Sequence, residues 1–178
     1  TYERKQPVRS SDIFDLASIT KVVSTTSGIM KLVDQNKIKI DKPVASYLPD
    51  FIGKKKKHKK QKSKITIRDL LSHSSGLPAF KQYFKMEKTK ELVLNSIYDT
   101  EPEREIGDTT IYSDIGAIML GEIVEKVSGV PLEVFMDSMV FEPLGMRTTF
   151  FNPPKEKLHR IIPTEIDPEG ELIHGYVH

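Results

Sequence analysis

Apolar residues with helical spacing begin at Ile19 and constrain the fold of this chain more than any other pattern. They recur at i+3, i+4 and i+7, which is typical of a helix with one buried face. Ser18 stands just before the first of them, so the pattern predicts that Ser18 lies at or near a helix N-terminus. The set consists of Ile19, Val22, Val23, Ile29, Met30 and Val33.

Ser18 and Lys21 form a Ser-x-x-Lys pair on this predicted helix. Residues three apart share a helix face, so the amine would stand one turn from the hydroxyl. The unpaired N–H groups at a helix start would favour a serine oxygen that becomes an anion. Burial against Val22 and Thr25 would lower the pKa of Lys21 and leave a neutral amine as a base. The alternatives are an N-cap serine and a solvated surface lysine, and the pair alone does not decide between them.

A second element combines a phenol, a hydroxyl and a carboxylate in Tyr112-Ser113-Asp114. A short β-prone run ends at Tyr112, and a helix is predicted over 115–127 with Gly129 as its stop. Ser113 or Asp114 would cap this helix. Tyr112 could complete a proton path to Ser18, or could be a half-buried core aromatic.

Five short stretches between residue 14 and about residue 150 occur in an order that resembles one family. They are Phe14–Lys21, Ile67–Pro78, Tyr112–Asp114, Leu120–Glu125 and Pro143–Met146. Together they resemble the serine β-lactamase-like hydrolases, which comprise class C β-lactamases, D,D-peptidases and related esterases. The resemblance implies an α+β fold of the β-lactamase/transpeptidase-like type. The segment present is predicted to be predominantly α-helical, with most of the family's β-sheet missing.

The resemblance implies a role for each residue of the two elements. Ser18 would be the acylated nucleophile, and its backbone N–H would form half of the oxyanion hole. Lys21 and Tyr112 would share general acid and base catalysis. Ser113 and Asp114 would bind substrate. The family often has Asn at the position of Asp114, and an ionised Asp only accepts hydrogen bonds. A carboxylate there would favour the charged form of Lys21 and shift proton transfer toward Tyr112.

The family's third motif, of the Lys-Thr-Gly or His-x-Gly type, has no convincing counterpart after Tyr112. Only 17 residues precede Ser18, whereas the family's sheet draws strands from both sides of the helical part. We therefore expect residues 1–178 to be one partial domain, an internal piece of a longer protein.

The charge of the chain is concentrated in residues 54–64, which hold eight lysines. The remaining 19 basic and 25 acidic residues would give a net charge of −6 instead of +2. A block of like charges usually stays extended, so we expect a Lys-rich surface loop with weak polyanion contacts at most. No aromatic residue interleaves with the lysines, so nucleic-acid binding is not expected. The alternative to an enzyme is a non-catalytic binding module that uses this loop or the cleft to hold an anionic polymer or a protein partner.

Composition narrows the remaining possibilities. The chain has no cysteine, and its five histidines form no paired ligand motif, so neither a metal nor another cofactor is expected. No apolar run is long enough to span a membrane. The family resemblance implies acyl-enzyme formation on an amide, β-lactam or ester group of a small-molecule or peptide substrate. By resemblance, the protein would be bacterial and periplasmic or otherwise extracytoplasmic.

Local signals predict several further elements. A short helix over 67–72 should begin with a capping box of Thr66 and Asp69. Helices are also expected over 88–98 and from Pro131 to before residue 143, and a short strand at Leu172 and Ile173. The loop after residue 72 contains His73, which could contact the site but is expected to be a buried, hydrogen-bonded histidine.

Overall fold

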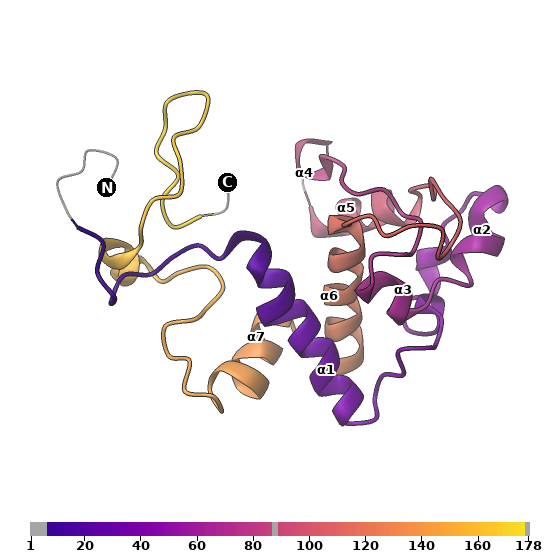
Figure 1. Cartoon of the computed structure of the whole chain (residues 1–178), viewed down its shortest axis with the longest axis horizontal. Coiled ribbons are helices and arrows are strands. Elements are labelled where there is room, and N and C mark those ends of the chain that lie inside the picture. Colours follow the sequence, from indigo (N-terminus) through magenta and orange to yellow (C-terminus); the bar gives the residue numbers. More distant parts are fainter. Residues whose placement is uncertain (1–6, 87–88, 177–178) are drawn as a thin grey trace.

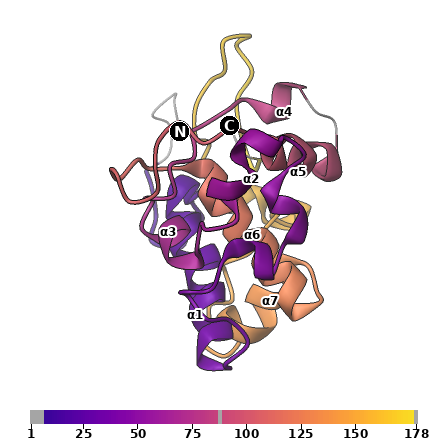
Figure 2. The same cartoon turned by 90° about the vertical axis from the view of Figure 1, so that its right-hand side faces the viewer.

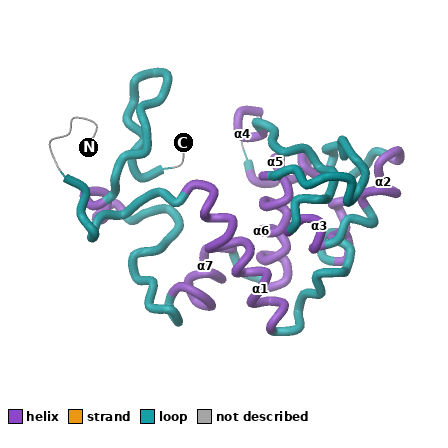
Figure 3. The backbone as a smooth tube through the Cα atoms, viewed as in Figure 1, coloured by secondary structure: helices purple, strands orange, loops and turns teal. Residues whose placement is uncertain are grey.

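The computed structural model of the protein describes residues 7–86 and 89–176, and this part of the chain is helix-rich (Figures 1 and 3). Within these ranges no strand forms, and β-pairing is limited to isolated bridges of Ile13 with Ile161, Pro43 with Thr66, and Ile166 with Leu172. The α-helices are α1 Ser27–Asp34, α2 Lys56–Lys62, α3 Ile67–Leu71, α4 Tyr83–Met86, α5 Lys90–Tyr98, α6 Asp114–Ser128 and α7 Leu132–Met136. Four 3-10 segments (Ala17–Ile19, Val44–Ser46, Pro49–Ile52 and Lys155–Arg160) and two π-helical segments (Lys21–Thr26 and Asp137–Phe141) complete the helical structure.

Helix α6 is the centre of the fold and confirms the helix predicted over 115–127. It contacts α1, α3 and α7, and Figure 1 shows it between α1 and the group of α2, α3 and α5. Its residues Ile115, Met119 and Ile123 are almost completely buried. The helix ends at Gly129, whose φ of 80° is the left-handed conformation that stops many helices. This long central helix fixes the place of the residues that precede it.

Helices α1 and α6 approach each other closely at Gly28. A Cβ atom at this position would lie 3.1 Å from Val124 Cγ2 and 3.3 Å from Met136 Sδ. Both distances are tighter than ordinary van der Waals contact, so a larger residue would push α1 away from α6 and α7. The N-terminal end of α1 is thereby held against the C-terminal half of α6, where Val124 lies.

The helical path from Ala17 to Asp34 confirms the predicted helix but not its predicted buried face. Ile29 is buried, whereas Ile19, Val22 and Met30 are 58%, 64% and 65% exposed. For Ile19 and Val22, the reason is the π-helical segment Lys21–Thr26. Its i→i+5 hydrogen bonds turn the chain by less per residue than an α-helix does, so the early residues lose register with the α-helical stripe.

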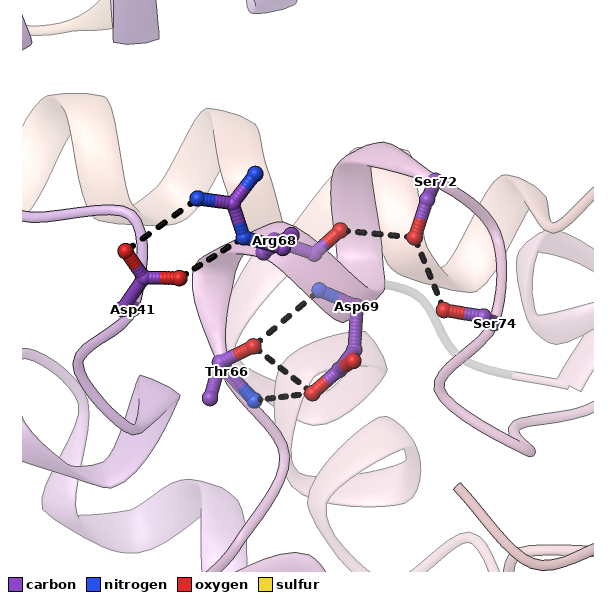
Figure 4. Close-up of polar contacts among 6 residues, drawn as sticks. All are labelled: Asp41, Thr66, Arg68, Asp69, Ser72 and Ser74. Carbon is purple, nitrogen blue, oxygen red and sulfur yellow. Dashed lines mark hydrogen bonds and ion pairs between the residues drawn. The ribbon is translucent and has the colours of Figure 1, made fainter. Parts of the chain in front are cut away.

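The predicted capping box at the start of α3 is confirmed (Figure 4). The Thr66 hydroxyl accepts from the Asp69 N–H at 3.2 Å, and the Thr66 N–H donates to Asp69 Oδ2 at 2.8 Å. At the other end of α3, Ser72 donates to the Arg68 carbonyl and contacts the hydroxyl of Ser74 at 2.7 Å. Both ends of α3 are thus fixed, and so is the start of the loop that contains His73.

The Lys-rich segment 54–64 is not the extended loop that its charge predicts. Residues Lys56–Lys62 form helix α2, and Lys62 is only 1% exposed. The prediction is wrong because it counted only charge repulsion within the segment. Buried hydrogen bonds from Lys62 to the carbonyls of Tyr98 and Thr100 outweigh that repulsion.

Two further predicted helices are present, whereas the predicted strand near the C-terminal end does not form. Helix α5 confirms the helix over 88–98, of which residue 88 lies outside the described ranges. Leu92 on this helix is exposed. Helix α7 follows Pro131, and the π-helical segment after it ends before Pro143, as predicted. The expected strand at Leu172 is reduced to a single bridge with Ile166.

Candidate active site

Ser18 lies in a sharp turn at the start of the helical path. Its predecessor Ala17 has a φ of 44°, a conformation that non-glycine residues seldom adopt. The Ala17 N–H donates to Asp15 Oδ1 at 2.7 Å, which helps to hold this turn. Ser18 itself is exposed. The structure therefore presents the Ser18 hydroxyl to solvent at a helix start, as the sequence predicts.

Lys21 joins the serine to the second element. Its Nζ atom donates to Ser18 Oγ at 2.9 Å and lies 2.8 Å from Asp114 Oδ1. The side chains of Lys21 and Asp114 are only 23% and 36% exposed, so the ion pair is partly shielded from water. Residues nearly a hundred positions apart in the sequence thus meet at one ammonium group.

The pKa of Lys21 is raised, not lowered as burial against its neighbours would suggest. Burial does act to lower this pKa, but hydrogen bonds to Asp114 and Tyr112 and the charge of Asp114 act in the opposite direction and prevail. The expectation of a neutral amine base is therefore wrong. The competing expectation, that the Asp114 carboxylate favours the charged form, is confirmed.

Tyr112 lies immediately before the cap of α6 and faces the same group. Its side chain is 52% exposed, and Lys21 Nζ lies 5.2 Å from the centre of its ring. Hydrogen bonding to Ser18 and then to Lys21 lowers the pKa of the Tyr112 phenol, while slight burial opposes this. A phenol in this setting gives up its proton more readily than a free tyrosine, which suits a general base.

Ser113 has a structural role in place of the predicted contact with substrate. It is 1% exposed, and its hydroxyl donates to the Pro78 carbonyl at 2.8 Å while accepting from the Gly116 N–H at 3.1 Å. It is therefore the N-cap of α6, one of the two caps that the sequence allowed. We correct the substrate-binding prediction for Ser113, because its hydroxyl is buried and already engaged on both sides.

His73 belongs to the site more closely than its sequence context indicates. Its Nδ1 atom accepts from the Ser113 N–H at 3.1 Å, and its ring centre lies 4.8 Å from that of Tyr112. Burial, followed by the charge of Lys21, lowers the pKa of this histidine. Its φ of 56° marks a tight turn. The sequence signals for this role are its place in a Ser- and Gly-rich loop and in the stretch Ile67–Pro78 that resembles the family.

A cavity of about 440 Å³ lies beside the Ser18 turn without including the reactive groups. Its lining includes Leu16, Thr20 and Val23 on one side and Phe151 and Ile161 on another. Ser18, Lys21 and Tyr112 lie outside it, on an open surface.

Neither a metal centre nor a membrane-spanning helix is found in the part of the chain that the structure describes. No group of three or more metal-ligating side chains is arranged to hold an ion among residues 7–86 and 89–176. No helix within the same ranges is both long enough and apolar enough to cross a bilayer.

The combination of a helix-start serine, a lysine one turn on and a facing tyrosine is the arrangement expected of the serine β-lactamase-like class. A sequence model of the Beta-lactamase family matches residues 2–168. The chain therefore belongs to the Beta-lactamase family, and its fold is of the β-lactamase/transpeptidase-like type.

Curated relatives are similar over most of this chain but over less than half of their own length. A putative D-alanyl-D-alanine carboxypeptidase of Escherichia coli strain K12 is 35% identical over 98% of this chain and 42% of its own. An N-acetylmuramyl-L-alanine amidase of Bacillus subtilis strain 168 is 33% identical over 84% of this chain and 36% of its own. Both are bacterial proteins named as hydrolases.

Solved structures agree on the fold. A class C β-lactamase from Rhodobacter sphaeroides has a TM-score of 0.76 at 23% identity, with 97% of this chain and 46% of that chain covered. An octameric penicillin-binding protein homologue from Pyrococcus abyssi has a TM-score of 0.75 at 27% identity, with 97% of this chain and 41% of that chain covered.

Proposed function

We propose that this chain carries the nucleophile and the proton-transfer groups of a serine hydrolase that forms an acyl-enzyme. The observation that carries the proposal is the position of Lys21 Nζ, 2.9 Å from Ser18 Oγ and 2.8 Å from Asp114 Oδ1, beneath the exposed ring of Tyr112. Family membership and the names of the relatives support the same reaction class.

Tyr112 is the proposed general base. Hydrogen bonding to Ser18 and to Lys21 lowers the pKa of Tyr112, which supports the phenolate as the group that deprotonates the serine. The phenolate oxygen takes the proton of Ser18 Oγ, which attacks the substrate carbonyl carbon and forms the new C–O bond. Lys21 stays charged, because its pKa is raised, and stabilises the negative charge that passes between the two oxygens.

The tetrahedral intermediate then collapses. Its oxyanion is stabilised by the backbone N–H of Ser18, which begins the helical path. The C–O or C–N bond to the leaving group breaks as Tyr112 returns its proton to that group. In the second half of the reaction, Tyr112 deprotonates a water molecule, which attacks the acyl carbon. The C–O bond to Ser18 then breaks as Tyr112 returns the proton to Ser18 Oγ.

The proposed substrates are amides, β-lactams or esters, in small molecules or peptides. The relative from Escherichia coli is named for D-alanyl-D-alanine, which favours a peptide with a free carboxyl end among these. Because the named relatives include enzymes of bacterial cell-wall chemistry, we propose an extracytoplasmic site of action.

The test is covalent labelling of Ser18 by intact-mass analysis. The chain is incubated separately with a penicillin and with a serine-reactive phosphonate ester. The matched control is Ser138→Ala, which removes another exposed serine from a helical segment. We expect one adduct that persists in Ser138→Ala and disappears in Ser18→Ala. An adduct that survives Ser18→Ala, or no adduct with either reagent on chain whose circular dichroism shows it to be folded, would contradict the proposal.

A further inference from the structure

Helix α2 places a dense set of positive charges at one edge of the molecule. It lies at the right-hand edge of Figure 1 and toward the viewer in Figure 2, separated from α1 by α6. An isolated helix of seven residues with lysines at i and i+4 would not form, because it is too short and its charges repel. Contacts with the rest of the fold must therefore hold it in place.

Lys62 is the principal anchor of α2. Its Nζ atom donates to the carbonyls of Tyr98 at 2.5 Å and Thr100 at 3.3 Å, and lies 4.8 Å from the centre of the Phe51 ring. Tyr98 ends helix α5, where carbonyl oxygens point outward and the helix dipole is negative. One lysine thus caps the C-terminal end of a neighbouring helix.

Polar contacts complete the docked face of α2. Gln61 Nε2 donates to the Arg104 carbonyl at 2.5 Å, and His58 Nε2 lies 3.2 Å from Glu101 Oε2. Lys55, just before the helix, pairs with Glu101 at 2.9 Å. These contacts fix the rotation of the helix about its own axis, so its other side chains have a defined direction.

The opposite face of α2 is entirely basic and open. Its lysines are exposed, and none forms an ion pair with a residue in 7–86 or 89–176. They lie along a helix about 10 Å long, with neighbours about 5–6 Å apart at i+3 and i+4. The set is Lys56, Lys57, Lys59, Lys60 and, just after the helix, Lys64.

The composition of this face restricts its ligand. Residues 54–64 contain neither an apolar nor an aromatic side chain other than His58, so the face has nothing to insert into a bilayer or to stack on a base. Only charge remains for recognition, and lysine ammonium groups are common point-charge partners of phosphate. A short line of such charges fits a chain whose own charges repeat along its length.

We propose that α2 is a docking ridge for an extended, phosphate-bearing polyanion. The site is separate from Ser18, so binding does not depend on acyl-enzyme chemistry and can hold the protein near a phosphate-rich polymer. Four lysine contacts to a flexible chain predict that log(1/Kd) falls with the logarithm of the salt concentration with a slope of about −3. This corresponds to roughly a 50-fold loss of affinity between 50 and 200 mM salt.

The test compares two variants with the same change in net charge. One carries Lys56→Gln, Lys57→Gln, Lys59→Gln and Lys60→Gln on α2. The control carries the same substitution at exposed lysines elsewhere, namely Lys37, Lys39, Lys42 and Lys126. Binding to fluorescent inorganic polyphosphate is measured as a function of salt, alongside thermal unfolding and Ser18 labelling.

We expect the α2 variant to bind polyphosphate at least tenfold more weakly with a salt slope closer to zero, and the control to change by less than threefold. Both variants should unfold at a similar temperature and keep Ser18 labelling, which separates this proposal from the hydrolase proposal. Equal loss in both variants would show a net-charge effect only and overturn the proposal. Tighter binding to vesicles of phosphatidylglycerol than to polyphosphate, at equal phosphate concentration, would overturn it in favour of a membrane surface.

Discussion

His73 and Ser113 are joined by a hydrogen bond in which the ring Nδ1 accepts the backbone N–H at 3.1 Å. Because Nδ1 accepts, the imidazole is neutral and carries its proton on Nε2. The His73 carbonyl also accepts the Ile111 N–H at 2.9 Å. One histidine therefore holds the backbone on both sides of Tyr112.

This relationship predicts that His73→Gly slows Ser18 labelling more than His73→Asn does. Asparagine keeps an acceptor near the position of Nδ1 and tolerates the left-handed backbone, whereas glycine keeps only the backbone conformation. We expect roughly a tenfold or greater loss of labelling rate for His73→Gly and a smaller one for His73→Asn, measured by time-resolved mass analysis.

The pH dependence provides a second readout for the same pair. Protonation would turn Nδ1 into a donor, break the bond to Ser113 and place a positive charge beside Lys21. Because the pKa of His73 is lowered from 6.5, wild-type labelling should fall only at pH values below 6.5. His73→Asn should lack this acidic fall. An unchanged acidic limb in His73→Asn would show that another group produces it.

Tyr112→Phe tests the proposed base directly. The ring and its contact with Lys21 remain, but the oxygen that receives the Ser18 proton is lost. We expect labelling to slow by about 10²- to 10⁴-fold, the usual contribution of a general base. The measurement is the labelling rate near neutral pH, with Tyr176→Phe as a control at another exposed tyrosine. Equal rates for Tyr112→Phe and wild type would assign the proton to another group.

Asp114→Asn should move the alkaline limit of Ser18 labelling to lower pH. The carboxylate raises the pKa of Lys21, so its removal lets the ammonium lose its proton earlier. The raised pKa of Lys21 also makes the stability of the fold depend on pH. A raised folded-state pKa means that the ion pair stabilises the fold below pH 10.5 and is lost as the pH rises through the folded-state value.

The experiment for Asp114→Asn is a pH–rate profile of labelling between neutral and alkaline pH. Asp137→Asn changes an exposed acid on another helical segment and serves as the control. An alkaline limit that stays in place in Asp114→Asn would mean that Lys21 does not need its charge for the reaction.

Lys62→Met should change how the unfolding free energy depends on pH. Burial lowers the pKa of Lys62 from 10.5 to about 8. Between these values the unfolded chain binds more protons than the folded one, so wild-type stability rises with pH relative to the variant. We expect the difference in unfolding free energy between wild type and Lys62→Met to grow by about 2 kcal/mol from pH 7 to pH 9.5. Urea denaturation at both pH values measures it.

Lys60→Met is the matched control for this prediction, because Lys60 lies on the exposed face of the same helix. Its difference from wild type should vary little with pH. If Lys62→Met behaves in the same way, the pKa of Lys62 is not lowered by burial.

Local patterns in the sequence were enough to predict the elements that carry the site. The capping box of Thr66 and Asp69 and the stop of α6 at Gly129 depend only on neighbours within one helical turn. The meeting of Ser18, Lys21 and Tyr112 was predicted through family resemblance, since no spacing rule relates residues so far apart in the sequence.

The failures share a physical cause, which is contact between distant segments. Lys62 is buried by the end of α5, and Ser113 is engaged by the carbonyl of Pro78. The raised pKa of Lys21 depends on whether burial or the carboxylate of Asp114 prevails, a balance of two opposing effects that geometry alone decides. Such outcomes need the folded arrangement and cannot be obtained from local composition.

The half-exposed ring of Tyr112 is attached to a backbone segment that hydrogen bonds hold in place. The backbone N–H groups of Ile111, Ser113 and Asp114 all donate hydrogen bonds to acceptors in the loop at 73–79, with donor–acceptor distances of 2.8 to 3.1 Å. Amide hydrogens so engaged exchange with solvent only when the segment opens, so slow hydrogen exchange is expected beside a surface-exposed side chain. The entropic cost of placing the phenol is therefore met during folding, before any substrate arrives.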